Sequence, residues 1–189
     1  MIRAVLGGSF DPVHSGHVAL GAHLLGAGLA DRLLVVPTGR SPHKESHLAA
    51  PQDRLAMCRS AFSQLEGAVV DDREILRGGT SYTVDTLAEL HEAHPEDELL
   101  LSIGADNLAG FRAWRDPGRI VGLARVAVYP RGGIVPTPAI CASAGIPADR
   151  LILVEDFDHP VSSTSVRAIL SQGRVPDLQL PSAAVSYTH

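Results

Sequence analysis

The stretch from Gly7 to His17 most constrains what this chain can fold into. It reads Gly-Gly-Ser-Phe-Asp-Pro-Val-His-Ser-Gly-His, after a run of β-forming residues at 2–6 and before apolar residues at helical spacing in 18–25. The pattern predicts a strand, a glycine-rich turn and a helix start. Such a turn offers backbone N–H groups and the positive helix end to an anion, and glycine lets a phosphate approach closely. His14 and His17 lie three residues apart, so one helical turn places them on one side.

Two other phosphate-binding patterns are absent. The chain lacks the Gly-x-x-x-x-Gly-Lys-Ser/Thr loop and the Gly-x-Gly-x-x-Gly fingerprint of dinucleotide oxidoreductases. The remaining alternative is a tight turn that carries two solvated histidines.

Composition narrows the class of protein. A length of 189 residues suits one domain, since about 100–200 residues per domain is usual. The formal net charge of −5 argues against a general attraction to nucleic acid. Cys58 and Cys141 are the two cysteines, which indicates neither a disulfide framework nor a zinc site. We expect a cytoplasmic protein without signal peptide or membrane span, because no apolar run approaches about 20 residues.

Strand-like runs alternate with helical ones along most of the chain, which predicts an α/β fold with a Rossmann-like, doubly wound parallel sheet in a single domain. The expected strands are Arg3–Gly7, Leu33–Pro37, Ala68–Asp72, Leu99–Gly104, Val126–Tyr129 and Leu151–Val154. The expected helices are His17–Gly28, Pro51–Leu65, Thr83–His94 and Asn107–Trp114. The segment Gly132–Pro147 is expected to be a surface connection with a short helix. Ligands of such sheets bind at the carboxyl ends of the strands.

A loop with several cations follows the second expected strand. Prolines and a glycine exclude a regular helix there, and the loop carries Arg40, His43 and Lys44. These side chains can lie over a polyphosphate, although a solvated basic loop is an equal alternative. In the next helix Arg54 lies among residues at core spacing, and we interpret that helix as structural.

Two further turns precede expected helices. In Gly78–Leu87, Thr80 or Ser81 is a suitable N-cap and Asp85 suits the first turn, so a capped helix is the simple interpretation. In Ile103–Leu108, the carboxylate of Asp106 can accept both hydroxyls of a ribose, or it can cap the helix.

Two later positions are informative. Trp114 is by default a core residue, although its ring suits stacking on a flat heteroaromatic. In Val161–Arg167, hydroxyls can cap a helix whose free N–H groups bind an anion, and Arg167 follows one turn later. The alternative is a capped helix with a surface arginine.

Taken together, these motifs resemble a known family. Gly-Ser-Phe-Asp-Pro-Val-His-x-Gly-His is similar to the signature of the nucleotidylyltransferase superfamily. Gly-x-Ser-Tyr-Thr-Val-Asp-Thr-Leu, Gly-Ala-Asp-Asn and Ser-Ser-Thr-x-Val-Arg resemble motifs of the bacterial nicotinate mononucleotide adenylyltransferases. Ser41 departs from the family's Pro-Pro-His-Lys loop, and Ala184 and Thr188 depart from its usual C-terminal pattern. The resemblance covers nearly the whole chain.

The resemblance implies one nucleotidylyltransferase domain over residues 1–189, with a C-terminal substructure from about residue 156. It implies transfer of AMP from ATP to nicotinate mononucleotide, which forms deamido-NAD and pyrophosphate. Mg²⁺ would be carried by ATP, and no metal ligand is expected from the protein. A homo-oligomer is possible, and neither nucleic acid nor membrane is an expected partner.

The resemblance also implies roles for single residues. The catalytic group would be His14, His17, Lys44 and Arg167. ATP would be bound by Gly7, Gly8, Ser9, Phe10, His14, His17, Gly104, Asp106, Ser162, Ser163, Thr164 and Arg167. The mononucleotide would be bound by His43, Lys44, Tyr82, Thr83, Asp106, Trp114 and Arg131.

Two alternatives stay open at this point. One is an adenylyl- or cytidylyltransferase of the same superfamily with another acceptor, such as phosphopantetheine. The other is a non-catalytic sensor that binds a nucleotide and keeps the fold.

Overall fold

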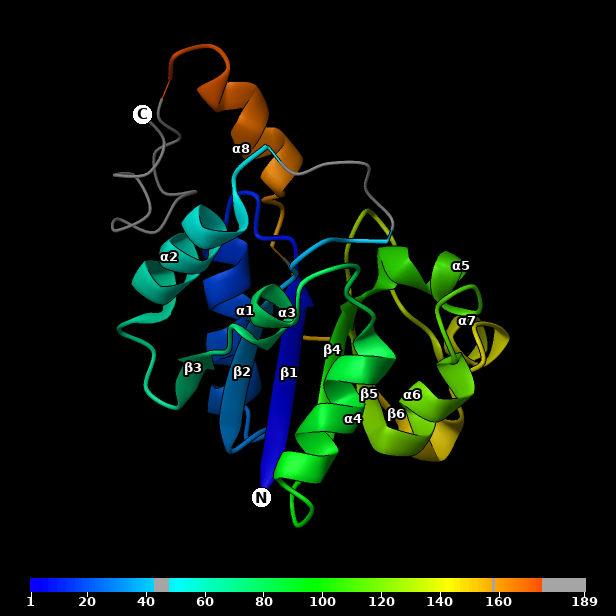
Figure 1. Cartoon of the computed structure of the whole chain (residues 1–189). Coiled ribbons are helices and arrows are strands. Elements are labelled where there is room, and N and C mark those ends of the chain that lie inside the picture. Colours follow the sequence, from blue (N-terminus) through cyan, green and yellow to red (C-terminus); the bar gives the residue numbers. More distant parts are fainter. Residues whose placement is uncertain (43–47, 158, 175–189) are drawn as a thin grey trace.

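The computed structural model of the chain describes residues 1–42, 48–157 and 159–174. A parallel sheet of six strands, in the order β3-β2-β1-β4-β5-β6, forms its centre (Figure 1). The strands are β1 (Ile2–Gly8), β2 (Arg32–Pro37), β3 (Ala68–Val70), β4 (Glu98–Gly104), β5 (Ala124–Tyr129) and β6 (Leu151–Leu153). The doubly wound parallel sheet expected from the sequence is confirmed, with every expected strand in place.

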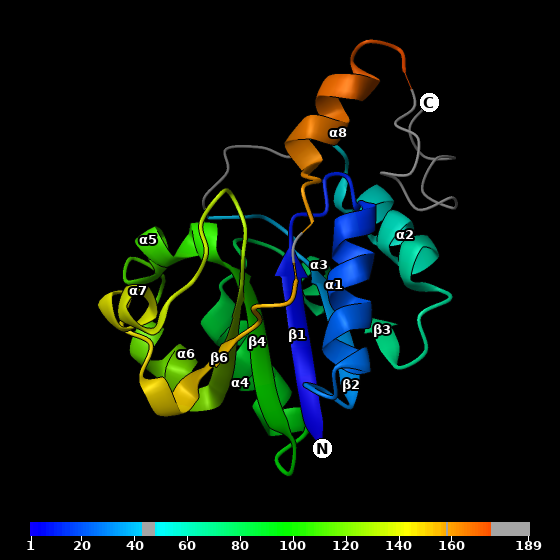
Figure 2. The same cartoon turned by 180° about the vertical axis from the view of Figure 1, so that it is seen from behind.

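Helices cover both faces of the sheet. They are α1 (Ser15–Gly26), α2 (Pro51–Phe62), α3 (Arg73–Arg77), α4 (Thr83–Ala93), α5 (Leu108–Phe111), α6 (Pro117–Leu123), α7 (Pro138–Ser143) and α8 (Ser163–Leu170). Two 3₁₀ turns span Ala105–Asn107 and Ala148–Arg150. The views from the front and from behind show α4 on one face of the sheet and α1 on the other, while α8 stands beyond the carboxyl ends of the strands (Figures 1 and 2).

Alternation along the strands explains the two faces. Val5 belongs to an apolar cluster with residues of α4 and α6, whereas its neighbours Ala4 and Leu6 belong to a cluster with residues of α1 and α2. Side chains of a strand point alternately to opposite faces, so a strand covered on both faces is apolar throughout. This is why the Val- and Leu-rich runs of the sequence identified the strands.

Three helical details differ from the sequence-based expectation. The expected helix Asn107–Trp114 is replaced by the 3₁₀ turn Ala105–Asn107 and the single turn of α5. The helices α3 and α6 were not expected, and each is too short for a clear helical period. Helix α6 begins behind Asp116, which adopts a left-handed backbone (φ 48°) and accepts a hydrogen bond from the Arg119 N–H.

The order of the strands indicates where in the sheet a ligand can bind, namely at the carboxyl ends of β1 and β4. Strand order changes direction between these two strands, because β2 and β3 extend to one side and β5 and β6 to the other. Such a switch point leaves a crevice at the carboxyl ends of the strands. The loops after β1 and β4 are those that carry the glycine motif and Asp106.

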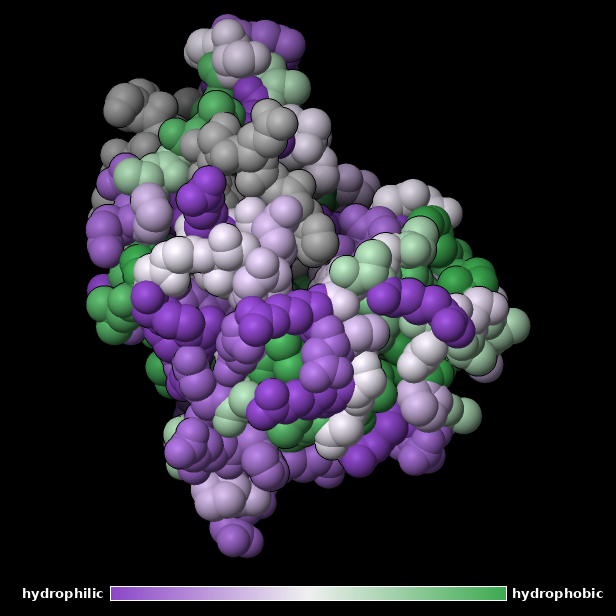
Figure 3. All heavy atoms as spheres, turned by 45° about the vertical axis from the view of Figure 1, so that its right-hand side comes forward, coloured by the Kyte–Doolittle hydropathy of each residue, from purple (hydrophilic) through white to green (hydrophobic). Residues whose placement is uncertain are grey.

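The outer surface shows no single large apolar area on the side drawn in Figure 3, where hydrophilic residues surround small apolar patches. Within residues 1–42, 48–157 and 159–174, no helix has the length and apolar character needed to cross a membrane.

Candidate active site

The loop between β1 and α1 turns sharply at Phe10. This residue has a positive φ of 46°, a strained conformation for a side-chain-bearing residue, and its side chain is buried. The ring lies against the backbone of Gly8, where an added Cβ would lie 3.2 Å from the ring. The ring also meets His17 edge to face, with centroids 4.8 Å apart. The buried ring thus fixes the loop beside the helix entrance.

The two histidines form a stacked pair at the start of α1. Their ring centroids lie 3.6 Å apart with an interplanar angle of 24°. The backbone N–H of His14 donates to Nδ1 of His17 at 3.2 Å. Because Nδ1 accepts this bond, the proton of a neutral His17 ring resides on Nε2. Nε2–H is therefore a donor available to a ligand.

Both rings are held neutral. Burial, with the nearby Arg131 and His159, lowers the pKa of His14 to about 3. Burial also lowers the pKa of His17 well below its ordinary value, and the His14 ring adds to this effect. The two ring nitrogens of His14 have no hydrogen-bond partner within the described part of the chain. Such orphaned buried groups are costly unless a ligand completes them.

A buried arginine connects two loops beneath the site. The Arg54 side chain is fully buried and donates to the carbonyl of Ser9 at 2.7 Å and to that of Gly39 at 3.0 Å. The first carbonyl belongs to the β1–α1 loop and the second to the loop after β2. The sequence indicated only a structural helix at this position, so the connection between loops is an addition from the structure.

Helix α8 docks onto the same loop from above. Arg167 donates to the Asp11 carbonyl at 2.6 Å, and the Ser163 hydroxyl donates to the Pro12 carbonyl at 2.9 Å. The expected hydroxyl cap is present, since the Ser162 hydroxyl accepts from the Ser165 N–H at 3.1 Å. The N-terminus of α8 therefore faces the entrance of α1.

A second polar group lies at the end of β4. Asp106 accepts from the Asn107 side chain at 3.0 Å and lies 3.5 Å from the Nε of Arg131. A Cβ on Gly104 would lie 2.5 Å from Cδ of Arg131 and 2.6 Å from Oδ1 of Asp106. Glycine at 104 is what leaves room for this pair. Asp106 is not a helix cap here, because it lies inside the 3₁₀ turn Ala105–Asn107, and neither that turn nor α5 has a side-chain cap.

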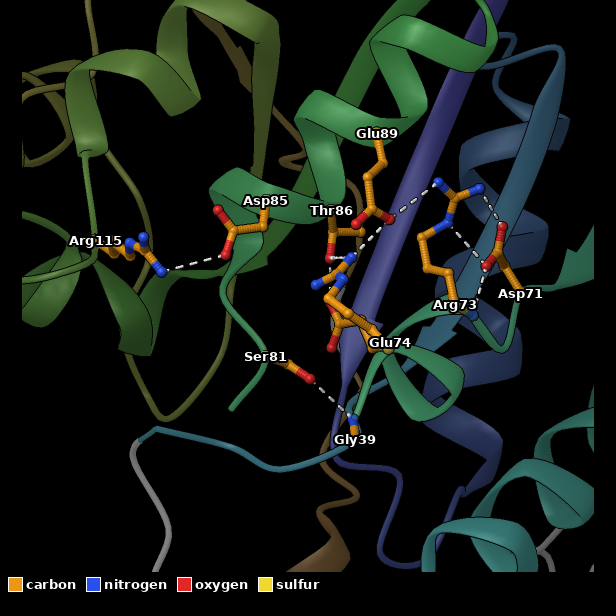
Figure 4. A network of polar contacts seen from close by, with 10 residues as sticks. Gly39, Asp71, Arg73, Glu74, Ser81, Asp85, Thr86, Glu89 and Arg115 are labelled. Carbon is orange, nitrogen blue, oxygen red and sulfur yellow. Dashed lines mark hydrogen bonds and ion pairs between the residues drawn. The ribbon is translucent and has the colours of Figure 1, made fainter. Parts of the chain in front are cut away.

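The N-terminus of α4 differs from the expected cap. Tyr82 occupies the N-cap position and no side-chain cap is formed, so the N-cap role expected for Thr80 or Ser81 is wrong. The Ser81 hydroxyl instead accepts from the Gly39 N–H at 3.2 Å (Figure 4). The Ser81 hydroxyl, which could have capped α4, is instead bound by a residue that is distant in the sequence.

A buried carboxylate fixes this junction. Glu74 of α3 accepts from the Thr86 hydroxyl at 2.6 Å and is hydrogen-bonded by the Ser81 hydroxyl. Burial raises the pKa of Glu74, while these two hydrogen bonds oppose the rise. Figure 4 shows the contact of Ser81 with Gly39 and that of Glu74 with Thr86. Glu74 thus holds the loop after β2 against the start of α4.

These parts surround one cavity of about 640 Å³ at the carboxyl ends of the strands. The sequence-predicted residues that line it are Gly7, Gly8, Ser9, Phe10, His17, Tyr82, Thr83, Gly104, Asp106, Trp114, Arg131, Ser162, Ser163, Thr164 and Arg167. His14 lies behind His17 and lines a small hollow of about 30 Å³ that it shares with His159. His43 and Lys44 lie outside the described residues.

Several residues of the site had no assigned role in the sequence. Glu74 and Arg115 line the cavity, and Arg54 supports it from below. A buried charge at a core position of a helix was the available signal for Arg54. Across the described residues, no group of three or more His, Cys, Asp or Glu side chains is placed to hold a metal ion.

The chain is similar in sequence to known proteins. The profile of the cytidylyltransferase-like family matches residues 5–169. A protein of Roseiflexus sp. (strain RS-1) named "Probable nicotinate-nucleotide adenylyltransferase" is 41% identical over 97% of this chain and 92% of its own length. One of the same name from Aquifex aeolicus is 42% identical over 71% of this chain and 80% of its own length.

Solved structures show the same fold. The nicotinic acid mononucleotide adenylyltransferase of Plasmodium falciparum, complexed with NaAD, superposes with a TM-score of 0.81 at 18% identity, over 98% of this chain and 93% of that one. The same enzyme complexed with APC gives a TM-score of 0.80 at 17% identity, with the same coverage.

Proposed function

Because the chain belongs to the cytidylyltransferase-like family, and among its relatives to the nicotinate-nucleotide adenylyltransferases, we propose that it transfers AMP from ATP to nicotinate mononucleotide. The products are nicotinate adenine dinucleotide and pyrophosphate, a step of NAD biosynthesis. The single observation that carries the proposal is the stacked His14–His17 pair, which lies at the start of α1 beside a cavity also lined by Arg167.

The reaction needs positioning more than proton transfer. An oxygen of the mononucleotide phosphate attacks the α-phosphorus of ATP, a new P–O bond forms, and the bond to the bridging α–β oxygen breaks. The electron pair leaves with pyrophosphate. Because the attacking phosphate is already ionised near pH 7, no general base is required. What the site must supply is stabilisation of the charge that develops on the phosphate oxygens.

The residues around the β1–α1 loop suit that task. Nε2–H of neutral His17 is the donor nearest the reacting phosphates, and backbone N–H groups of Ser9 and Phe10 add to it. Arg167, on α8, faces the leaving pyrophosphate. We extend the same role to Lys44, which the sequence motif places in the loop after β2. The N-terminus of α8 contributes its free N–H groups.

The other parts of the cavity suit the remainder of the two substrates. Asp106, exposed at the end of β4, can accept ribose hydroxyls. Trp114 is half-buried, packs on Phe111 with ring centroids 5.2 Å apart, and lines the cavity together with Tyr82 and Thr83. We assign the pyridine ring to this end, with Gly7, Gly8, Gly104, Ser162, Ser163 and Thr164 on the ATP side and His43 and Arg131 on the mononucleotide side.

We further propose that Mg²⁺ enters as the Mg–ATP complex. Its ligands would be phosphate oxygens and water, as is usual for this hard cation.

The test is pyrophosphate release with Mg²⁺, ATP and each of three acceptors: nicotinate mononucleotide, nicotinamide mononucleotide and phosphopantetheine. We expect turnover with nicotinate mononucleotide, and mass spectrometry should identify the dinucleotide. Turnover with phosphopantetheine alone would contradict the acceptor assignment. Tight ATP binding without pyrophosphate release would indicate a nucleotide sensor.

A further inference from the structure

One cation lies at the pyridine end of the cavity and has no part in the roles given above. Arg115 follows Trp114 directly and lines the cavity with it. Its guanidinium carbon lies 4.7 Å from the centroid of the Tyr82 ring. A guanidinium over an aromatic face is held by cation–π attraction and by stacking. Tyr82 therefore orients the charge of Arg115 at the wall of the cavity.

Arg115 forms an ion pair with Asp85, which lies outside the lining of the cavity. NH1 of Arg115 donates to Oδ2 of Asp85 at 3.3 Å, as Figure 4 shows, whereas Asp85 does not line the cavity. A guanidinium has five N–H donors, and this contact uses one of them. The others can serve a ligand while the pair with Asp85 persists.

A second positive feature lies at the same end. Helix α4 begins at Thr83, and the N–H groups of Thr83 and Val84 donate to no acceptor in the described part of the chain. These groups carry the positive end of the helix dipole. The other arginines of the cavity lie elsewhere, with Arg131 beside Asp106 and Arg167 against the β1–α1 loop.

We propose that Arg115 is a specificity-determining residue, which selects a pyridine mononucleotide with a carboxylate over its neutral carboxamide analogue. This inference rests on the proposed function, since it assumes that the pyridine ring lies between Tyr82 and Trp114. The carboxylate is ionised near pH 7 and can accept two parallel N–H bonds from a guanidinium. The carboxamide carries no charge and must turn an NH₂ group toward some acceptor, so it gains less from Arg115.

The experiment compares kcat/KM for nicotinate and nicotinamide mononucleotide in the wild-type protein and in Arg115→Gln. We expect the variant to lose about 10- to 100-fold with nicotinate mononucleotide, the range of a charge-assisted hydrogen bond, and to stay within about 3-fold with nicotinamide mononucleotide. Arg115→Lys keeps the charge but loses the two parallel N–H bonds, so it should retain only part of the preference. An unchanged ratio in Arg115→Gln overturns the inference.

Asp85→Asn separates recognition from a structural role of the ion pair. Both Asp85→Asn and Arg115→Gln remove the ion pair at 3.3 Å, but only Arg115→Gln removes the cation. If Arg115 recognises the carboxylate, Asp85→Asn should keep or increase the preference for nicotinate mononucleotide. An equal loss in both variants would mean that the pair merely braces α4, and would overturn the inference.

Arg119→Gln is the matched control, because Arg119 is exposed on α6 and does not line the cavity. We expect it to leave both kcat/KM values unchanged. Thermal unfolding of every variant reports whether the fold persists. If the wild-type protein adenylates neither mononucleotide, the proposed function fails and this inference fails with it. Turnover of both with an unaltered ratio in Arg115→Gln rejects the inference alone.

Discussion

At the level of single residues, the contact between His14 and His17 determines which ring nitrogen of His17 carries the proton and can donate a hydrogen bond. The backbone N–H of His14 fixes Nδ1 of His17 as an acceptor, so that Nε2 carries the proton. A neutral donor held in place needs little reorganisation when charge develops on a phosphate. In the proposed reaction the pair would act through its fixed orientation, to which its burial contributes.

Replacement of His17 by alanine should lower kcat by about 100- to 1,000-fold, because one preorganised donor to the developing charge is lost. Steady-state pyrophosphate release measures it. His91→Ala, at an exposed position of α4, is the control and should leave kcat unchanged. A His17→Ala enzyme with wild-type turnover would remove His17 from the mechanism.

Gly104 offers a second prediction at this scale. An added Cβ would lie 2.5 Å from Cδ and 3.1 Å from Cβ of Arg131, and 2.6 Å from Oδ1 of Asp106, so Gly104→Ala must shift both side chains and should cost about 1 kcal/mol of stability. It should displace the carboxylate proposed to hold a ribose, and raise KM about 10-fold, the effect of one hydrogen bond. Gly110→Ala, which meets no atom within 4 Å, is the control for both measurements. A KM that stays unchanged, whatever happens to Tm, would contradict this explanation.

At the scale of elements, the cavity depends on loops held together by buried polar groups. Arg54 of α2 connects the loop after β1 to that after β2, and Glu74 of α3 connects the latter to α4 through Ser81. The guanidinium of Arg54 and the hydroxyl of Ser81 form hydrogen bonds with backbone groups of these loops inside the fold. Loss of one partner leaves the others buried and unpaired, which is more costly than loss of a solvent-exposed contact.

Arg54→Met should therefore lower the free energy of unfolding by about 3 kcal/mol, because the carbonyls of Ser9 and Gly39 lose their donors. KM for ATP should rise as the loop after β1 loosens. Arg59→Met is the control on the same helix: its ion pair with Asp72 at 2.9 Å is exposed and should be worth under about 1 kcal/mol. Urea denaturation gives both values, and equal losses in the two variants would refute the explanation.

At the scale of the whole molecule, the buried histidines couple stability to pH. The folded protein keeps His14 neutral down to about pH 3 and lowers the pKa of His17 as well, whereas the unfolded chain protonates both near pH 6.5. The unfolded state thus binds more protons below about pH 6.5. Stability contributed by neutral His14 is full above that pH and is lost as the pH falls toward about 3.

The free energy of unfolding should accordingly fall below about pH 6.5, by up to about 1.4 kcal/mol per pH unit for each histidine. Glu74 acts in the opposite sense, because its pKa is raised in the folded state and its stabilisation is lost as the pH rises. Denaturation at pH 4.5, 5.5, 6.5 and 7.5 measures the slope. The double variant His14→Gln, His17→Gln should flatten it, and an equally steep slope in that variant would show that other groups are responsible.

The strands, their alternation with the helices, and the positions of the glycine-rich and serine-rich turns were predictable from the sequence alone. Two-sided burial leaves a continuous apolar run, and a turn before a helix needs particular residues at adjacent positions, so both signals are local. The family motifs followed from the same adjacent positions. The neighbourhood of His14 and His17 was predictable as well, because a single helical turn separates them.

Tertiary structure decided the contacts between segments far apart in the chain. Ser81 was expected to cap α4, but its hydroxyl binds Gly39, 42 residues away. Arg115 lies over Tyr82 only because the loop after β4 returns beside α4. Contacts of this kind depend on how the helices pack across the sheet, and the conformational preferences of neighbouring residues do not predict that packing.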